Sequence, residues 1–195
     1  MEKLNGKKKL IVSVFISGRG TNLNSLINFS KRKDSPIKIC LIITNNKNAK
    51  GLYFAKKNKI KFLIINYKKK IKAENKILLN LKSYNINLIC LAGFMKILSK
   101  KIINKYKHRI LNIHPSLLPK YKGLNTHKRV LKNNEKFTGC TVHVVNSKLD
   151  SGKIILQKKI KVLKKDDENS LSKRVLKIEN LTYPQAIKKF VSSNL

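Results

Sequence analysis

The chain has 195 residues, of which 42% are hydrophobic, and its 45 Lys and Arg against 9 Asp and Glu residues give a formal net charge of +36. This length fits one domain that buries a substantial core. No apolar run reaches the roughly 18 residues that a membrane helix requires, so we expect no membrane partner. The basic start MEKLNGKKK lacks a small-residue cleavage site after it, which argues against a secretory signal.

The basic charge would ordinarily indicate a nucleic-acid partner. Lysine outnumbers arginine 40 to 5, however, and the lysines are spread along the whole chain together with abundant Asn and Ile. Nucleic-acid sites favour arginine, because its guanidinium forms bidentate and stacking contacts. We therefore interpret the charge as the composition of an AT-rich genome and expect no specific nucleic-acid partner, although the charge can steer anionic substrates.

The three cysteines, Cys40, Cys90 and Cys140, show no metal-ligand spacing. They are best interpreted as reduced thiols of a cytoplasmic protein, and we expect no bound metal.

Strand-like and helix-like segments alternate along the first half of the chain. In order, they are 8–17 (KKLIVSVFIS), 21–31 (TNLNSLINFSK), 37–46 (IKICLIITNN), 51–59 (GLYFAKKNK), 61–67 (KFLIINY), 72–83 (KAENKILLNLKS) and 87–93 (NLICLAG). This βαβ rhythm predicts a parallel sheet with helices on both faces. The near-continuous Val, Ile and Leu of the first strands is typical of strands covered on both faces.

The rhythm changes after residue 114. Segments 137–146 and 153–163 predict a hairpin or a pair of antiparallel strands, and Asp and Ser in 166–170 can cap a helix that covers 171–181. The predicted fold class is therefore α/β, a Rossmann-like open, mostly parallel twisted sheet with an antiparallel C-terminal part. We expect one domain over 1–195, with halves at about 9–100 and about 101–195.

Residues 111–123 (LNIHPSLLPKYKG) are hard to explain as ordinary core. Asn112 and His114 lie two residues apart at a strand end, so both side chains point to the same face. Pro115 and Pro119 then stop the strand and stiffen the loop that follows. A surface turn with a chance histidine is the alternative, but a loop of this kind more often serves function.

Residues 17–22 (SGRGTN) lie between a predicted strand and a predicted helix. Gly18 and Gly20 let the backbone approach an anion, and Thr21 and Asn22 add a hydroxyl and an amide. On sequence alone, a phosphate site and a plain tight turn remain equally open.

Taken together, ISGRGTNL (16–23), LAGFMKIL (91–98), LNIHPSLLP (111–119), TVHVVNSKLDSGKIILQ (141–157) and an IEN-TYP-like segment (178–184) resemble the folate-dependent formyltransferases. The resemblance is strongest to the glycinamide ribonucleotide formyltransferases of purine synthesis. It implies transfer of the formyl group of 10-formyltetrahydrofolate to the amino group of glycinamide ribonucleotide, by a monomer or a homodimer. The products would be formylglycinamide ribonucleotide and tetrahydrofolate.

The resemblance also implies roles for individual residues. Asn112, His114 and Asp150 would supply the oxyanion donor, the proton-moving group and its carboxylate partner. Gly20, Thr21 and Asn22 would hold the nucleotide phosphate, and Glu179 its glycinamide part. The folate would contact Met95, Lys96, Ile97, Leu98, Asn112, Asn146, Ser147, Lys148, Leu149 and Asp150.

Several of these positions have a plainer reading without the resemblance. Asp150 could form an Asx turn before Gly152, and residues 93–98 could be the packed start of a helix. His143 alternates with valines, and a hydrogen-bonded strand histidine is the favoured reading over one that faces the site. This chain also has Lys96 where the family commonly has arginine, and only lysines near residue 70.

Three other functions compete with this reading. Methionyl-tRNA formyltransferases share the Asn-x-His-Pro motif but carry a second, tRNA-binding domain, and formyltetrahydrofolate hydrolases carry a preceding regulatory domain. We expect neither extra domain in these 195 residues. A basic nucleic-acid-binding protein on a degenerate enzyme fold is the third alternative, against which the intact Asn112, His114 and Asp150 argue.

Overall fold

The computed structural model describes residues 3–4 and 7–193. The chain forms two compact units, unit 1 at residues 1–111 and unit 2 at residues 112–195. The boundary falls inside strand β7 (Ile110–His114), so the polar end of this strand, Asn112 and His114, belongs to unit 2.

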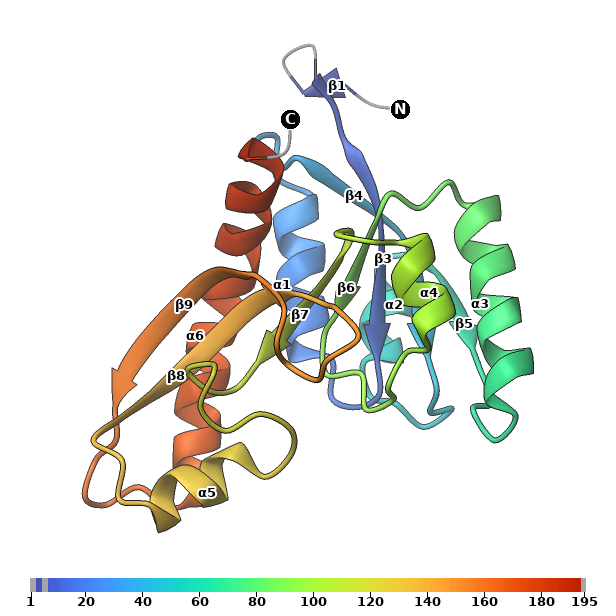
Figure 1. The fold of residues 1–195 in the computed structure, drawn as a ribbon. Helices are drawn as coiled ribbons and strands as arrows, with labels where there is room; N and C mark the ends of the chain where they lie inside the picture. Colours follow the sequence, from blue (N-terminus) through green and yellow to red (C-terminus); the bar gives the residue numbers. More distant parts are fainter. Residues whose placement is uncertain (1–2, 5–6, 194–195) are drawn as a thin grey trace. The chain divides into compact units, whose positions relative to one another are not determined.

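Unit 1 is built on parallel strands in the order β5-β4-β3-β6. These strands are β3 (Leu10–Ile16), β4 (Ile37–Thr44), β5 (Lys61–Ile64) and β6 (Leu88–Leu91) (Figure 1). A short antiparallel pair, β1 (Lys3–Leu4) and β2 (Lys7–Lys8), precedes them in the chain. The centres of β3, β4 and β6 are almost completely buried. This agrees with their continuous apolar sequence.

The helices of unit 1 are α1 (Thr21–Ser30), α2 (Leu52–Lys57), α3 (Lys70–Ser83) and α4 (Lys100–Lys105). Helix α1 packs against β4, and α2 packs against β5. In α1, Leu23, Leu26 and Ile27 are buried at the spacing of one helix face. The six-residue helix α4 was not predicted, because a single buried residue, Ile102, leaves no periodicity to read.

Unit 2 contains the end of β7, then α5 (Thr126–Lys132), β8 (Phe137–Val144), β9 (Ile154–Lys161) and α6 (Glu168–Ser192). Strands β8 and β9 pair in the antiparallel sense, as the sequence predicted, and α6 packs against both (Figure 1). Asp167 caps α6 in a capping box with Ser170, which confirms the predicted cap.

Helix α6 is longer than the predicted segment 171–181, because it continues through Pro184 to residue 192. A proline inside a helix removes one backbone hydrogen bond. Tyr183, Ile187 and Phe190 are buried beyond the expected end of the helix, and their burial offsets that loss. Among the described residues, no helix combines the length and the apolar character needed to cross a bilayer.

The predicted fold class is confirmed: parallel strands come first, antiparallel strands follow at the C-terminal end, and helices surround them. The unpredicted helices α4 and α5 are both shorter than eight residues. Such short helices carry too few turns for an amphipathic pattern to show.

The close pairing of β8 with β9 depends on Gly139, because a Cβ there would lie 1.9 Å from the backbone oxygen of Lys158. We expect Gly139→Ala to lower the free energy of unfolding by about 3 kcal/mol, as a steric clash with backbone does. Gly18→Ala is the matched control, since its Cβ would meet nothing within 4 Å. Denaturant unfolding of the full chain measures both, and equal small losses would contradict the role of Gly139.

Candidate active site

His114 is held at the end of β7 with 5% of its surface exposed. Its Nε2 lies 2.8 Å from the backbone oxygen of Tyr121. Because a carbonyl oxygen can only accept, Nε2 carries the hydrogen of this bond. The neutral ring therefore has its lone pair on Nδ1, which lies 3.5 Å from Oδ2 of Asp150. Nδ1 is therefore the nitrogen at which the neutral ring can accept a proton.

Asp150 is oriented by a distant part of the chain. Its Oδ2 accepts a hydrogen bond from the backbone N–H of Gly123 at 2.9 Å, 27 residues away in sequence. This bond favours a role in the site over a local Asx turn. The loop around Asp150 also needs Gly152, because a Cβ there would lie 1.7 Å from the backbone oxygen of Val144.

His143 belongs to the same group of side chains, contrary to the reading of it as a strand histidine apart from the site. Its Nδ1 lies 3.0 Å from the Val144 carbonyl, so Nδ1 donates and Nε2 accepts in the neutral ring. Nε2 lies 3.3 Å from Nδ2 of Asn112 and 3.6 Å from Oδ1 of Asp150. We call Asn112, His114, His143 and Asp150 the unit 2 cluster.

No feature of the sequence singles out His143, but the structure shows why it lies in the unit 2 cluster. Residues two apart on a strand share a face, so Thr141 and His143 point the same way on β8. The Thr141 hydroxyl donates to the carbonyl of Ser116 at 2.6 Å and accepts from the N–H of Leu118 at 3.0 Å. The face of β8 that holds His143 is thus the face that meets the loop after His114.

Burial and charge determine the protonation of this cluster. Burial lowers the pKa of His114, and the Tyr121 carbonyl and the Asp150 carboxylate oppose that effect without overcoming it. Burial would raise the pKa of Asp150, but the His143 ring, the Gly123 N–H and the charge of His114 outweigh it, so this pKa lies below its usual value. Near neutral pH the cluster therefore holds an ionised carboxylate beside a neutral imidazole.

In unit 1, the loop at 17–22 leads from β3 into α1. Gly20 is the residue before α1, with φ at 77°, and a Cβ there would lie 2.4 Å from Cα of Gly51. Packing against Gly51 therefore accounts for Gly20 whether or not an anion binds. Thr21 and the buried Asn22 form the first turn of α1, where backbone N–H groups point out of the helix.

Residues 92–99 form an anchored loop, so the reading of 93–98 as the start of a helix is wrong: α4 begins only at Lys100. The Met95 N–H donates to the Ser17 hydroxyl at 2.8 Å, and the Ser99 N–H donates to the buried Glu74 carboxylate at 2.9 Å. These two bonds fix both ends of the segment that carries Met95 to Leu98.

The side chains of this loop point in different directions. Met95 is 63% exposed and Ile97 is 72% exposed, and Lys96 is also exposed. Leu98 is 5% exposed and belongs to the core of unit 1. The loop thus presents two apolar side chains on a fixed backbone.

The other predicted residues lie in unit 2. Asn146, Ser147, Lys148 and Leu149 are exposed in the loop between β8 and β9, where the Asn146 side chain accepts from the Lys148 N–H at 2.9 Å. Glu179 is buried on α6. Burial raises the pKa of the Cys140 thiol to about 11, and the nearby Glu179 carboxylate adds to this rise.

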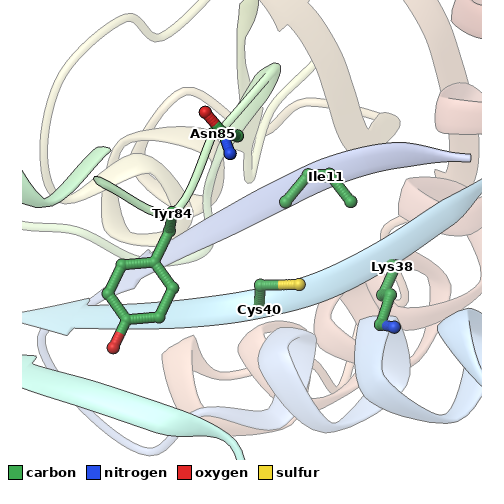
Figure 2. Close-up of a pocket in the computed structure, with 5 residues that line it drawn as sticks. All are labelled: Ile11, Lys38, Cys40, Tyr84 and Asn85. Atoms are coloured by element: carbon green, nitrogen blue, oxygen red, sulfur yellow. The ribbon is translucent and has the colours of Figure 1, made fainter. Parts of the chain in front are cut away.

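Unit 1 also has a cavity of about 430 Å³, lined by Ile11, Lys38, Cys40, Tyr84 and Asn85 (Figure 2). It contains none of the predicted site residues. Its lining comes from the beginnings of β3 and β4 and from the end of α3. Ligands of parallel α/β sheets bind beyond the carboxyl ends of the strands, so this cavity is not the candidate active site.

A histidine and a carboxylate beside an amide donor are suited to moving a proton while an oxyanion forms. Comparison with protein families identifies the class: residues 9–187 match the formyl transferase family, and the chain belongs to that family. The resemblance drawn from the sequence motifs is confirmed.

Within the formyl transferase family, the chain is similar to proteins named phosphoribosylglycinamide formyltransferase. The chain is 40% identical to the phosphoribosylglycinamide formyltransferase of Haemophilus influenzae, over 94% of this chain and 88% of that one. A crystal structure of phosphoribosylglycinamide formyltransferase from Brucella melitensis matches with a TM-score of 0.89 and 40% identity, over 94% of this chain and 96% of that one. The human trifunctional purine biosynthetic protein adenosine-3 is 40% identical over 97% of this chain, which spans only 19% of that protein's length.

The pairing of His114 with Asp150 can be tested through titration. Because the carboxylate favours the protonated ring, we expect Asp150→Asn to lower the pKa of His114 below its value in the unaltered chain. Asp34→Asn, which removes an exposed carboxylate paired with Arg32 in unit 1, should leave this pKa unchanged. Histidine NMR across a pH series measures both, and equal pKa values for His114 in the two variants would show that Asp150 does not act on the ring.

Proposed function

We propose that the chain transfers the formyl group of 10-formyltetrahydrofolate to the amino group of glycinamide ribonucleotide in the synthesis of purine nucleotides (IMP). The observation that carries this proposal is the contact of His114 Nδ1 with Asp150, with the opposite ring nitrogen committed to a backbone carbonyl. That arrangement supplies one titrating nitrogen beside an anion, which is the group that acyl transfer to an amine requires.

The reaction forms one carbon–nitrogen bond and breaks another. The amine nitrogen attacks the formyl carbon, and the bond from that carbon to N10 of the folate breaks after a tetrahedral oxyanion has formed. The amine must lose a proton, and N10 must gain one. Formylglycinamide ribonucleotide and tetrahydrofolate are the products.

Asn112 is proposed as the oxyanion donor. One hydrogen of its Nδ2 points to Nε2 of His143, which leaves the second hydrogen for the substrate. The His143 contact also fixes the amide plane before the substrate arrives. A donor fixed in advance stabilises the developing charge without reorganisation, and removal of such a donor costs about 10²- to 10³-fold in rate.

His114 is proposed as the group that moves the proton. Its lowered pKa keeps Nδ1 free to accept a proton from the attacking amine near neutral pH. The imidazolium that results lies 3.5 Å from the Asp150 carboxylate, which stabilises it until the proton passes to the leaving nitrogen. Tyr121 keeps the other nitrogen, Nε2, out of this exchange.

In unit 1, the anchored loop at residues 92–99 is proposed to contact the folate ring. Met95 and Ile97 provide exposed apolar side chains on a backbone fixed by Ser17 and Glu74. A flat heterocycle requires apolar faces of this kind together with backbone hydrogen bonds at its edge. Lys96 and Leu98 belong to the same loop and are proposed folate contacts, although the Leu98 side chain itself packs in the core of unit 1. In unit 2, Asn146 to Asp150 are proposed as folate contacts.

In unit 1, Gly20, Thr21 and Asn22 are proposed to bind the phosphate of the nucleotide. In unit 2, Glu179 is proposed to recognise its glycinamide part. Helix α1 is ten residues long, and its N-cap residue, Gly20, has no side chain that could bond to the N–H groups of the first turn. N–H groups at such a helix start favour an anion. The net charge of +36 would speed the encounter with anionic substrates.

The proposal treats the two units as one formyltransferase domain, monomeric or homodimeric, that acts in the cytoplasm. It involves no metal, no membrane and no specific nucleic acid. In the part of the chain that the structure describes, none of the three cysteines forms a disulfide.

Loss of either side chain of the proposed centre should abolish most of the turnover. His114→Ala and Asn112→Ala should each lower kcat by about 10²-fold or more, as expected for a proton-transfer group and an oxyanion donor. His108→Asn is the matched control, because His108 is exposed and has a positive φ that asparagine tolerates. Steady-state assays with both substrates measure the effect. A folded His114→Ala protein with near-normal turnover would contradict the mechanism.

The phosphate loop is tested through Thr21, because packing against Gly51 would confound any change at Gly20. Thr21→Val removes the hydroxyl and keeps the shape, so it should weaken glycinamide ribonucleotide binding about tenfold, the effect of one hydrogen bond to a charged group. Binding of the same nucleoside without phosphate, and of the folate, should not change. Ser30→Ala, at the other end of α1, is the control.

Calorimetry with each ligand separately measures these affinities. Equal losses for the phosphorylated and the phosphate-free ligand would mean that Thr21 does not contact the phosphate.

A further inference from the structure

The loop at residues 120–124 contacts two ionisable members of the unit 2 cluster, His114 and Asp150. Its Tyr121 carbonyl accepts from Nε2 of His114, and its Gly123 N–H donates to Asp150. Tyr121 has a φ of 57° and Gly123 a φ of 78°. The left-handed conformation is unfavourable for a tyrosine, so other contacts must stabilise it in this loop.

Arg129 on α5 supplies such contacts. Its Nη1 donates to the carbonyl of Lys122 at 2.6 Å and lies 3.5 Å from the carbonyl of Leu124. The guanidinium carbon also lies 5.2 Å from the centre of the Tyr121 ring. A planar guanidinium can donate in its plane while its face lies on an aromatic ring, which a lysine ammonium cannot do.

The far end of the Tyr121 side chain is held as well. Its hydroxyl donates to Oε1 of Glu135 at 2.8 Å and accepts from Nδ2 of Asn133 at 2.9 Å. Lys120 also binds Glu135, with its Nζ 2.7 Å from Oε1. Tyr121 is therefore fixed at its hydroxyl by Glu135 and Asn133, and at its ring by Arg129.

We infer that Arg129 is a positioning residue for the proposed formyl transfer: it holds the 120–124 loop in the one conformation that keeps hydrogen on Nε2 of His114 and orients Asp150. The kinetic part of this inference rests on the proposed function. The structural part does not, because the hydrogen on Nε2 can be observed without any substrate.

The hydrogen has two competing acceptors. The Tyr121 carbonyl favours the neutral ring with hydrogen on Nε2, whereas the Asp150 carboxylate beside Nδ1 favours the ring with hydrogen on Nδ1. If the 120–124 loop becomes mobile, the hydrogen bond from Nε2 to the Tyr121 carbonyl weakens. The Asp150 carboxylate then favours the neutral ring with its hydrogen on Nδ1. Nδ1 then already carries a proton, so it cannot accept one from the attacking amine.

Nitrogen NMR of histidine-labelled full-length protein tests this directly, because only four histidines contribute signals. At a pH where His114 is neutral, the unaltered chain should show hydrogen on Nε2. Arg129→Met should shift a substantial fraction to hydrogen on Nδ1. Lys128→Met makes the same charge change at an exposed neighbour on α5 and should leave the signal unchanged.

Kinetics provide the second readout. Arg129→Met should lower kcat about tenfold while KM for both substrates stays within about threefold, the pattern of a group that acts on the chemical step. Arg129→Lys should recover only part of the loss. Tyr121→Phe, which keeps the ring but loses the Glu135 bond, should shift the histidine signal in the same direction, and it serves as the test if Arg129→Met does not fold.

The inference is overturned if folded Arg129→Met keeps both the Nε2 signal and an unaltered kcat, or if Lys128→Met produces the same changes. If the signal shifts as expected but the unaltered chain does not formylate glycinamide ribonucleotide, the proposed function fails and the positioning role of Arg129 stands.

Discussion

The hydrogen bond between Nε2 of His114 and the Tyr121 carbonyl sets where the His114 ring carries its hydrogen. Because this bond commits Nε2, the other nitrogen, Nδ1, which faces Asp150, is the one that can accept a proton. A similar bond from Nδ1 of His143 to the Val144 carbonyl leaves Nε2 of that ring to accept from Asn112. Two backbone carbonyls thus orient the two imidazole rings. The Asp150 carboxylate contacts both rings, and the Asn112 amide contacts the ring of His143.

These hydrogen bonds are strong because the two imidazole rings are buried. With 5% of His114 and 2% of His143 exposed, water does not compete strongly for the ring nitrogens, and each hydrogen-bond partner counts fully. Burial also lowers the pKa of His114 toward the neutral form that a base requires. The burial of His114 and its protonation therefore depend on the same three features. These are the end of β7 at His114, the return of the loop to this residue at Tyr121, and the left-handed backbone of Tyr121.

Much of the fold could be predicted because the strands of unit 1 are continuous apolar runs and because turns separate them. The pairing of Asn112 with His114 followed from the two-residue period of a strand. The contact of His114 with Asp150 did not, since 36 residues separate them and only the return of the chain after β8 brings them together. His143 was misjudged because its valine neighbours suggested a core strand, and α4 and α5 were too short to leave a pattern.

The acidic residues of this chain are few, but several of them make specific contacts. Against 45 cationic residues there are only 9 acidic ones, and several of these make specific contacts: Asp150 in the cluster, Glu74 under the 92–99 loop, Glu135 at Tyr121 and Asp167 at the start of α6. The abundant lysines are mostly exposed, and changes at single lysines should matter little to stability. These carboxylates, together with Arg129 at the 120–124 loop, are charged groups that make specific contacts in the structure.

The proposed function requires that the formyl group passes from the folate to the amine of glycinamide ribonucleotide. The most direct test follows the carbon itself, with 10-formyltetrahydrofolate labelled with ¹³C in the formyl group and glycinamide ribonucleotide as acceptor. The account predicts that the label appears in the amide of formylglycinamide ribonucleotide, in equal amount to the tetrahydrofolate released. Label recovered as free formate at the same rate with and without the nucleotide would contradict it.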